Sequence, residues 1–131
     1  MVNCSDDDKT SMTNVMSYND EDIPIKYLEA KQVGDNLLIT GANDDDHGFI
    51  IEFRDKTIET LDGVYTFNDD DEYNPVTDFS GAFLNNSTGA HVVTSGQVTV
   101  NDVDGTNITL SFVVNADGIP ATGVYVGDYT E

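Results

Sequence analysis

The fold is decided by the stretch Gln97-Val98-Thr99-Val100-Asn101-Asp102-Val103-Asp104-Gly105-Thr106-Asn107-Ile108-Thr109-Leu110-Ser111-Phe112. Apolar and polar residues alternate over Ile108–Phe112, as they do in a strand with one buried face. The pair Asp104-Gly105 suits the centre of a hairpin turn, where a positive φ is needed. The stretch therefore predicts two antiparallel strands joined by a tight turn.

The same pattern extends in both directions along the chain. Residues 49–53 alternate in the same way, and the turn-forming segments Asn85–Gly89 and Asn115–Gly118 separate further apolar runs. Helical periodicity is nearly absent, and the strand-like runs recur about every 8–12 residues. We expect strands near residues 15–18, 25–32, 36–40, 48–53, 63–67, 78–84, 91–101, 106–115 and 118–126.

Short turns make consecutive strands neighbours, so an antiparallel up-and-down meander is the simplest topology. We therefore predict an all-β fold of about 8–10 strands, either a small barrel or a two-sheet sandwich. The 131 residues suffice for one domain, which we place at residues 14–131, after a polar tether at residues 1–13.

Acidic residues dominate the charge of the chain. There are 25 Asp and Glu against 5 Lys and Arg, which gives a net charge of −20. This composition argues against nucleic-acid binding, because contacts to phosphates need clustered Lys and Arg. Thirteen of the acids fall in four runs at loop-like positions, namely Asp6–Asp8, Asp20–Asp22, Asp44–Asp46 and Asp69–Glu72.

The N-terminal segment carries the most specific motif. It reads Met1-Val2-Asn3-Cys4-Ser5-Asp6-Asp7-Asp8-Lys9, with the single cysteine of the chain followed by a serine and three acids. This segment resembles the processed end of a bacterial lipoprotein, and Ser5–Asp8 resembles the export signal of surface lipoproteins of Bacteroidota. The hydrophobic part of a signal peptide is absent, so we expect Met1 to be a trimmed start.

The resemblance implies roles for five residues. Cys4 would carry the lipid, and Ser5, Asp6, Asp7 and Asp8 would direct export to the outer face of the outer membrane. Several acyl chains on one cysteine give stable anchoring, at about 0.8 kcal/mol per buried methylene. The polar segment that follows would be a flexible leash of up to about 30 Å.

The C-terminal half also resembles, loosely, small β domains of such lipoproteins. The residues that carry this resemblance are Gly96-Gln97-Val98, Asp104-Gly105, Ile108-Thr109, Phe112 and Gly123–Gly127. No catalytic residue is implied by it.

The acidic runs in the folded domain are candidate partner or calcium ligands, because calcium takes six to eight oxygen ligands. The loop Asn43–Gly48 has the glycine of an EF-hand at its sixth place, but Arg54 stands where the bidentate glutamate belongs. An irregular site remains open if two of the runs meet at one end of the sheet. Its ligands would come from Asp44, Asp45, Asp46, Asp69, Asp70, Asp71 and Glu72.

Motifs for catalysis are missing from the sequence. His47 and His91 are the two histidines, and neither lies in a zinc-binding HExxH motif or beside a GxSxG nucleophile elbow. There is no tryptophan and little loop length to wall a sugar-cleaving cleft. We expect a non-enzymatic protein that requires no cofactor, with calcium as the one candidate ion.

The sequence thus predicts a lipid-anchored domain at the outer-membrane surface that acts by protein binding. Its partner would be an outer-membrane complex for transport, secretion or protein insertion, for example a barrel of the TonB-dependent transporter type. Two alternatives stay open: a calcium-dependent or glycan-binding surface module, and an immunity or inhibitor protein whose acidic surface meets a basic toxin.

Overall fold

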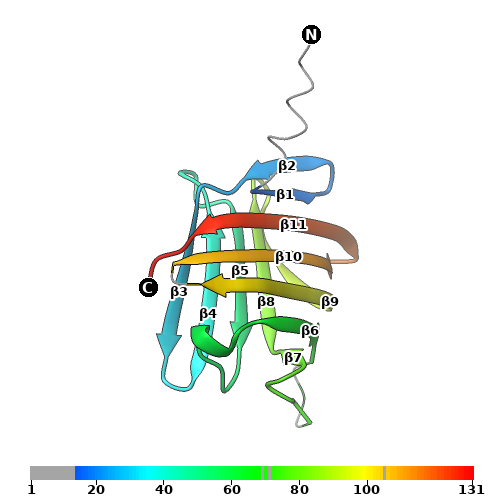
Figure 1. Cartoon of the computed structure of the whole chain (residues 1–131). Helices are drawn as coiled ribbons and strands as arrows, with labels where there is room; N and C mark the ends of the chain where they lie inside the picture. Colours follow the sequence, from blue (N-terminus) through cyan, green and yellow to red (C-terminus); the bar gives the residue numbers. More distant parts are fainter. Residues whose placement is uncertain (1–13, 69, 71, 105) are drawn as a thin grey trace.

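The computed structural model describes residues 14–131 except residues 69, 71 and 105, and it is all-β (Figure 1). No helix among these residues is long and apolar enough to span a membrane. The elements are β1 (Val15–Tyr18), β2 (Glu21–Pro24), β3 (Tyr27–Val33), β4 (Asn36–Ala42), β5 (Gly48–Phe53), the 3₁₀ turn η1 (Ile58–Thr60), β6 (Gly63–Phe67), β7 (Asp78–Phe79), β8 (Gly81–Asn86), β9 (Gly89–Asp104), β10 (Asn107–Ala116) and β11 (Ile119–Asp128).

The strands form one curled sheet, a half-barrel, in the order β2-β1-β11-β10-β9-β8-β5-β4-β3. Its front wall contains β2, β1, β11, β10, the second part of β9, and β6 and β7, which pair beside β9. Its back wall contains β3, β4, β5, β8 and the start of β9, and its strands cross those of the front wall in Figure 1. The predicted all-β class is confirmed.

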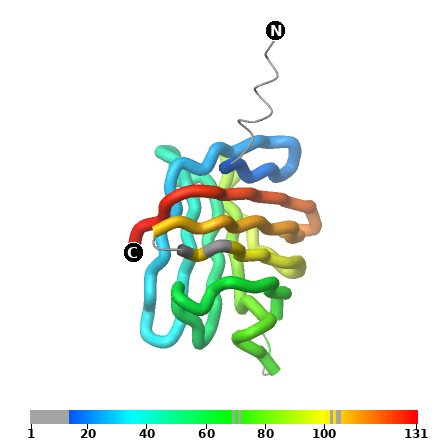
Figure 2. Tube along the Cα trace, viewed as in Figure 1, coloured from blue at the N-terminus to red at the C-terminus, as the bar shows by residue number. Residues whose placement is uncertain are grey.

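The strands β3 to β5, and again β8 to β11, are arranged as the predicted meander, with hairpins at the predicted turns. In the β10–β11 turn, Asp117 and Gly118 have φ angles of 54° and 78°, as a tight hairpin requires. The first strand, β1, pairs with the last strand, β11. Figure 2 shows β1 beside β11, where Val15 pairs with Val124.

The structure has eleven strands, because one predicted strand is split and one strand was not predicted. The predicted strand 25–32 begins later, at Tyr27, and β2 forms before it by pairing with β1. The predicted strand 78–84 is interrupted at Ser80, whose N–H donates to the Glu52 carbonyl. Before Ser80 the chain pairs in parallel with β6, and after it the chain pairs with β5. Both differences arise from strand pairing, which alternation does not encode.

The long strand β9 connects the two walls. Val92 pairs with Phe83 of β8, whereas Val98 pairs with Phe112 of β10. Between them lies Gly96, with a φ of 131°, where an added Cβ would stand 2.4 Å from the Val114 Cα. A glycine is needed here because backbone approaches backbone at the corner of the half-barrel.

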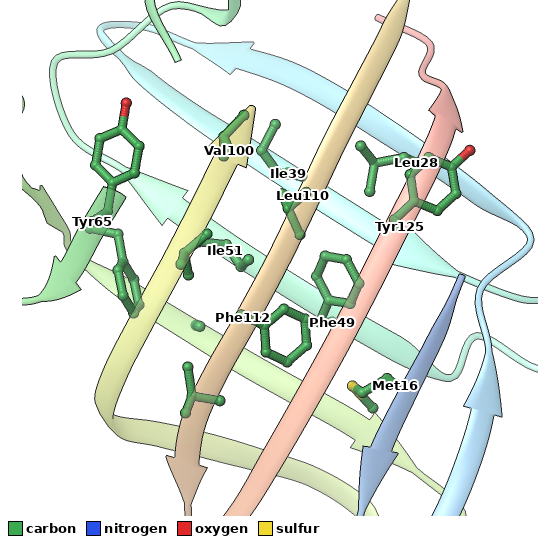
Figure 3. Close-up of a cluster of buried hydrophobic side chains, with 14 of the residues drawn as sticks. Met16, Leu28, Ile39, Phe49, Ile51, Tyr65, Val100, Leu110, Phe112 and Tyr125 are labelled. Atoms are coloured by element: carbon green, nitrogen blue, oxygen red, sulfur yellow. The ribbon is translucent and has the colours of Figure 1, made fainter. Parts of the chain in front are cut away.

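Two glycines opposite two phenylalanines let the walls pack closely. Gly41 pairs with Phe49 and Gly123 pairs with Phe112, and each ring lies where a Cβ of the paired glycine would stand. The two rings meet edge to face at 5.0 Å between centroids, in the middle of the core drawn in Figure 3. Such aromatic–glycine pairs fix the register across the sheet.

The residues after β11 close one side of the half-barrel. The Ala30 N–H donates to the Thr130 carbonyl at 2.7 Å, and the Thr130 N–H donates to the Leu28 carbonyl at 3.0 Å. These bonds join the outer strand of the back wall to the end of the front wall.

Replacing Gly96 with alanine is expected to lower the free energy of unfolding by roughly 2 kcal/mol or more, because the new Cβ overlaps backbone and φ is positive. Urea denaturation measures the change. Gly81→Ala is the matched control, since its Cβ would meet only the Glu52 carboxylate at 3.9 Å. Equal loss in both variants would contradict the role of Gly96 at the corner.

Candidate functional site

The loop with Asp44–Asp46 and the loop with Asp70 and Glu72, which hold the candidate ligands, lie at opposite ends of β5. Asp46 lies just before β5, whereas Tyr73, one residue after Glu72, accepts the N–H of Arg54 just beyond the end of β5, at 2.9 Å. The structure therefore does not bring Asp44, Asp45 and Asp46 together with Asp70 and Glu72. Asp69 and Asp71 lie outside the described residues, as do Cys4, Ser5, Asp6, Asp7 and Asp8. Within the part that is described, no group of three or more His, Cys, Asp or Glu residues could hold a metal ion.

The β4–β5 loop is organised by a buried asparagine. The Asn43 carboxamide accepts the Asp45 N–H at 2.9 Å and donates to the Pro24 carbonyl at 3.0 Å. Asp44 lies 2.8 Å from the Lys26 ammonium in an exposed ion pair, and this hydrogen bond raises the pKa of Lys26. The loop is thus built as a rigid turn that displays its acids toward solvent.

The β6–β7 loop is organised by the carboxylate of Asp78. It accepts the Asn74 N–H at 2.8 Å, the Asn68 amide at 3.0 Å and the Thr77 hydroxyl at 3.1 Å. Burial of Asp78 would raise its pKa, but these hydrogen bonds outweigh burial and lower the pKa below its usual value.

A hollow of about 440 Å³ lies on the outer side of the back wall, beside the β4–β5 loop. We call it the outer hollow. Its lining residues come from β3, β4, β5, β8 and β9 and from the loop: Tyr27, Thr40, Gly41, Ala42, Asp46, Gly48, Phe49, Ile50, Phe83, Asn85 and Ala90.

Small residues make the hollow, because the cross-strand row Tyr27–Ala42–Gly48–Asn85 has no large side chain at its centre. An added Cβ at Gly48 would overlap the Gly41 carbonyl oxygen, so a larger residue cannot fill the space. Tyr27, which is 43% exposed, bounds one side. Asn85 bounds the other and donates to the Asp46 carbonyl at 2.6 Å.

An apolar row continues from the hollow across three strands. Ile50, Phe83 and Val92 are successive cross-strand partners on the outer side of the back wall, and they are 41%, 48% and 51% exposed. Exposed Glu29 lies further along the same row, beyond Thr40. Exposed apolar side chains next to acids resemble the centre and rim of a protein-binding surface.

A wider groove of about 900 Å³ lies at the far end of the back wall and is lined by Lys31 and Lys56. Lys56 is buried, which lowers its pKa, and its ammonium lies 5.1 Å from the centre of the Tyr65 ring. Burial, with Asp62 and Tyr73 nearby, raises the pKa of Tyr65 to about 12. Lys56 thus has a cation–π partner in the core. With acids such as Glu59 also lining the groove, no single ligand chemistry is favoured there.

A hydrogen-bonded chain around His91 was not anticipated from the sequence. His91 Nδ1 lies 2.6 Å from the Asp117 carboxylate, and His91 Nε2 lies 2.9 Å from the Thr88 hydroxyl. The order hydroxyl, imidazole and carboxylate is that of a nucleophilic triad. The residues come from two different hairpin turns, so no local motif could reveal it.

Other contacts of these three residues, Thr88, His91 and Asp117, favour a structural role. The Thr88 hydroxyl lies 2.7 Å from the side-chain Oδ1 of Asn86, which can only accept, so the hydroxyl proton is directed there and away from the imidazole. An activated nucleophile needs the opposite arrangement. The His91 ring also packs 4.9 Å from the Tyr18 ring, and the Tyr18 hydroxyl donates to Ala116. Together these contacts connect the β8–β9 turn to β1 and to the β10–β11 turn.

The outer hollow is the site that sequence reasoning missed, although a signal was present. The alternation expected over residues 49–53 is broken at Ile50, which is apolar where a polar residue would stand, and Phe83 likewise precedes the buried Leu84. Apolar residues on both faces of a strand indicate that the outer face also contacts another surface.

No protein-family model, curated protein or solved structure matches this chain.

Replacing Asp78 with alanine is expected to lower the free energy of unfolding at neutral pH by roughly 1–2 kcal/mol, since three hydrogen bonds lose their acceptor. A folded-state pKa below the unfolded value of about 3.9 makes this contribution complete above that value. The contribution is then lost as the pH falls through the lowered pKa.

Urea denaturation from neutral to strongly acidic pH measures the difference between wild type and Asp78→Ala. Asp45→Ala, at an exposed loop position, controls for the loss of one acid. A stability difference for Asp78→Ala that is unchanged in strong acid would contradict the assignment.

Proposed function

We propose that this protein is a non-catalytic, lipid-anchored cell-surface protein that acts as an accessory subunit of an outer-membrane complex. In this proposal Cys4 carries the lipid, Ser5–Asp8 direct export, and the folded domain binds a protein partner. The partner is part of a transport, secretion or protein-insertion machine.

The observation that carries the proposal is the outer hollow with its apolar row. Tyr27, Ile50, Phe83 and Val92 expose large apolar side chains on one side of the back wall. Aromatic anchors at the centre of a patch contribute most to binding free energy in protein interfaces. A hollow with a fixed glycine floor accepts a side chain without rearrangement, which keeps the entropic cost of binding low.

Charge favours a partner with a basic rim. Asp46 lies in the lining of the hollow, exposed Asp44 and Asp45 precede it, and the chain carries a net charge of −20. Complementary charges speed association and set orientation, and their effect falls as salt rises. The proposed complex therefore weakens at high ionic strength.

The test is capture of the partner from native outer membranes by tagged, lipidated protein. Wild type should recover a stoichiometric membrane protein, and Phe83→Asp should reduce that recovery at least tenfold, because it places a charge at the centre of the apolar row. Val113→Asp is the matched control, since Val113 is exposed on the front wall and receives the same charge.

The Cys4→Ser protein should be lost from the membrane fraction. This result tests the lipid anchor separately from the binding surface. Recovery of the free protein alone from wild-type membranes would overturn the proposed complex. Equal loss in Phe83→Asp and Val113→Asp would show that binding does not use the outer hollow.

A glycan-binding surface module is the second candidate, and the lining of the hollow favours it. The Tyr27 and Phe83 rings suit the apolar face of a sugar, while Asp46 and Asn85 offer polar groups for its hydroxyls. This function predicts retention on a glycan array that Tyr27→Ala abolishes and Val113→Asp leaves intact. Absence of retention by wild type would dismiss it.

A further inference from the structure

Among the side chains that the structure describes, sixteen adjacent outward ones on five strands of the front wall are uncharged. We call this surface the neutral face. Its outward side chains, from β6, β9 after the corner, β10, β11 and β1, are Val64, Thr66, Ser95, Gln97, Thr99, Asn101, Thr109, Ser111, Val113, Asn115, Pro120, Thr122, Val124, Val126, Val15 and Ser17.

An uncharged face of this size is unusual in so acidic a chain. Asp, Glu, Lys and Arg make up 23% of the residues. An even distribution would place about four charged side chains among sixteen outward positions. Two exposed acids lie at the margins of the neutral face: Asp128 at the end of β11, and Asp22 on β2, which accepts the Ser17 hydroxyl at 2.7 Å.

The pairing register makes the neutral face continuous. One cross-strand row runs Val64–Thr99–Ser111–Val124–Val15 across all five strands. Val113 lies diagonally beside Val124, and its exposed fraction of 63% is among the highest of the large apolar residues described. Short β-branched and hydroxyl side chains give a surface of even height, on which a second sheet can pack at about 10 Å.

We propose that the neutral face binds a second copy of this chain, so that two front walls pack face to face in a two-fold symmetric dimer. Two-fold contacts use the same patch on both subunits. In such a dimer Val113, Val124 and Val126 of each copy lie near the centre, and the acidic loops lie outside the contact.

The charge distribution selects a second copy as the occupant. A basic partner gains more from the acidic loops than from a face without charge, so charge steers it elsewhere. Another copy is repelled by the net charge of −20 everywhere except where the two uncharged surfaces meet. Association through the neutral face buries none of the ionised groups of the acidic loops, and burial of an unpaired charge costs several kcal/mol.

The area of the neutral face agrees with a weak dimer. Neighbouring strands are about 4.8 Å apart, and outward residues repeat about every 6.8 Å, so each covers roughly 33 Å². Roughly sixteen such residues cover about 500 Å², and two faces cover about 1,000 Å². This is the lower limit of specific protein interfaces, and we expect a dissociation constant in the micromolar range.

The dimer has an unusual dependence on salt. Between two strongly acidic copies the long-range force is repulsive, and added salt screens it, from a Debye length of about 10 Å at 0.1 M toward about 3 Å at 1 M. Dimerisation therefore strengthens as salt rises. The complex with a basic partner has the opposite dependence.

Sedimentation equilibrium of the full chain tests the proposal, at protein concentrations up to about 500 µM in about 0.05 M and about 0.5 M NaCl. The average mass should rise with concentration toward twice the monomer mass, with a dissociation constant at least tenfold lower at high salt. Val113→Asp should raise the dissociation constant at high salt at least tenfold, because two like charges then face each other.

Phe83→Asp is the matched control, since it adds the same charge to the back wall and should leave dimerisation within about twofold of wild type. A thermal melt shows that both variants are folded. Monomer at every concentration and salt, or equal weakening by both variants, would overturn the dimer. These outcomes leave the proposed partner complex untouched, because that complex depends on Phe83 and not on Val113.

Discussion

The close contact between Gly96 and Val114 is the constraint on which the rest of the structure depends. It lets one strand, β9, pair with β8 in the back wall and then with β10 and β6 in the front wall. With both walls on one strand, the Phe49 and Phe112 rings meet between them, each over the glycine of a neighbouring strand. A side chain at Gly96 would separate β9 from β10 and remove the corner that brings the walls together.

The local elements could be predicted from the sequence because they are encoded locally. Asn115–Gly118 turns as its composition predicts, and the strands Val15–Tyr18, Gly48–Phe53 and Gly63–Phe67 begin and end at the predicted residues. The long-range pairings could not be predicted, because alternation states which face is buried and not which strand lies alongside. Thus β7 pairs in parallel with β6, and Ser80 divides a run that looks continuous in sequence.

The outer hollow was not predicted, although one of the candidate acids, Asp46, lies in its lining. The acid of the Asp44–Asp46 loop does border a hollow, but the floor of that hollow comes from Ala42 and Gly48, which the sequence presents as ordinary strand residues. The Val, Thr and Asn composition of the C-terminal half indicates strands with few charges. The continuity of the neutral face depends on register, since a shift of one residue in any strand would turn Thr and Val inward and core residues outward.

The two walls thus separate two kinds of surface on one small domain. The back wall combines exposed aromatic residues with nearby acids, which suits a partner of opposite charge. The neutral face of the front wall lacks charge, which suits a copy of equal charge. In a face-to-face dimer the two back walls point away from each other, so each copy keeps its outer hollow accessible. In the two proposals, acids at the loops and an uncharged neutral face direct self-association and partner binding to separate surfaces, with opposite dependence on salt.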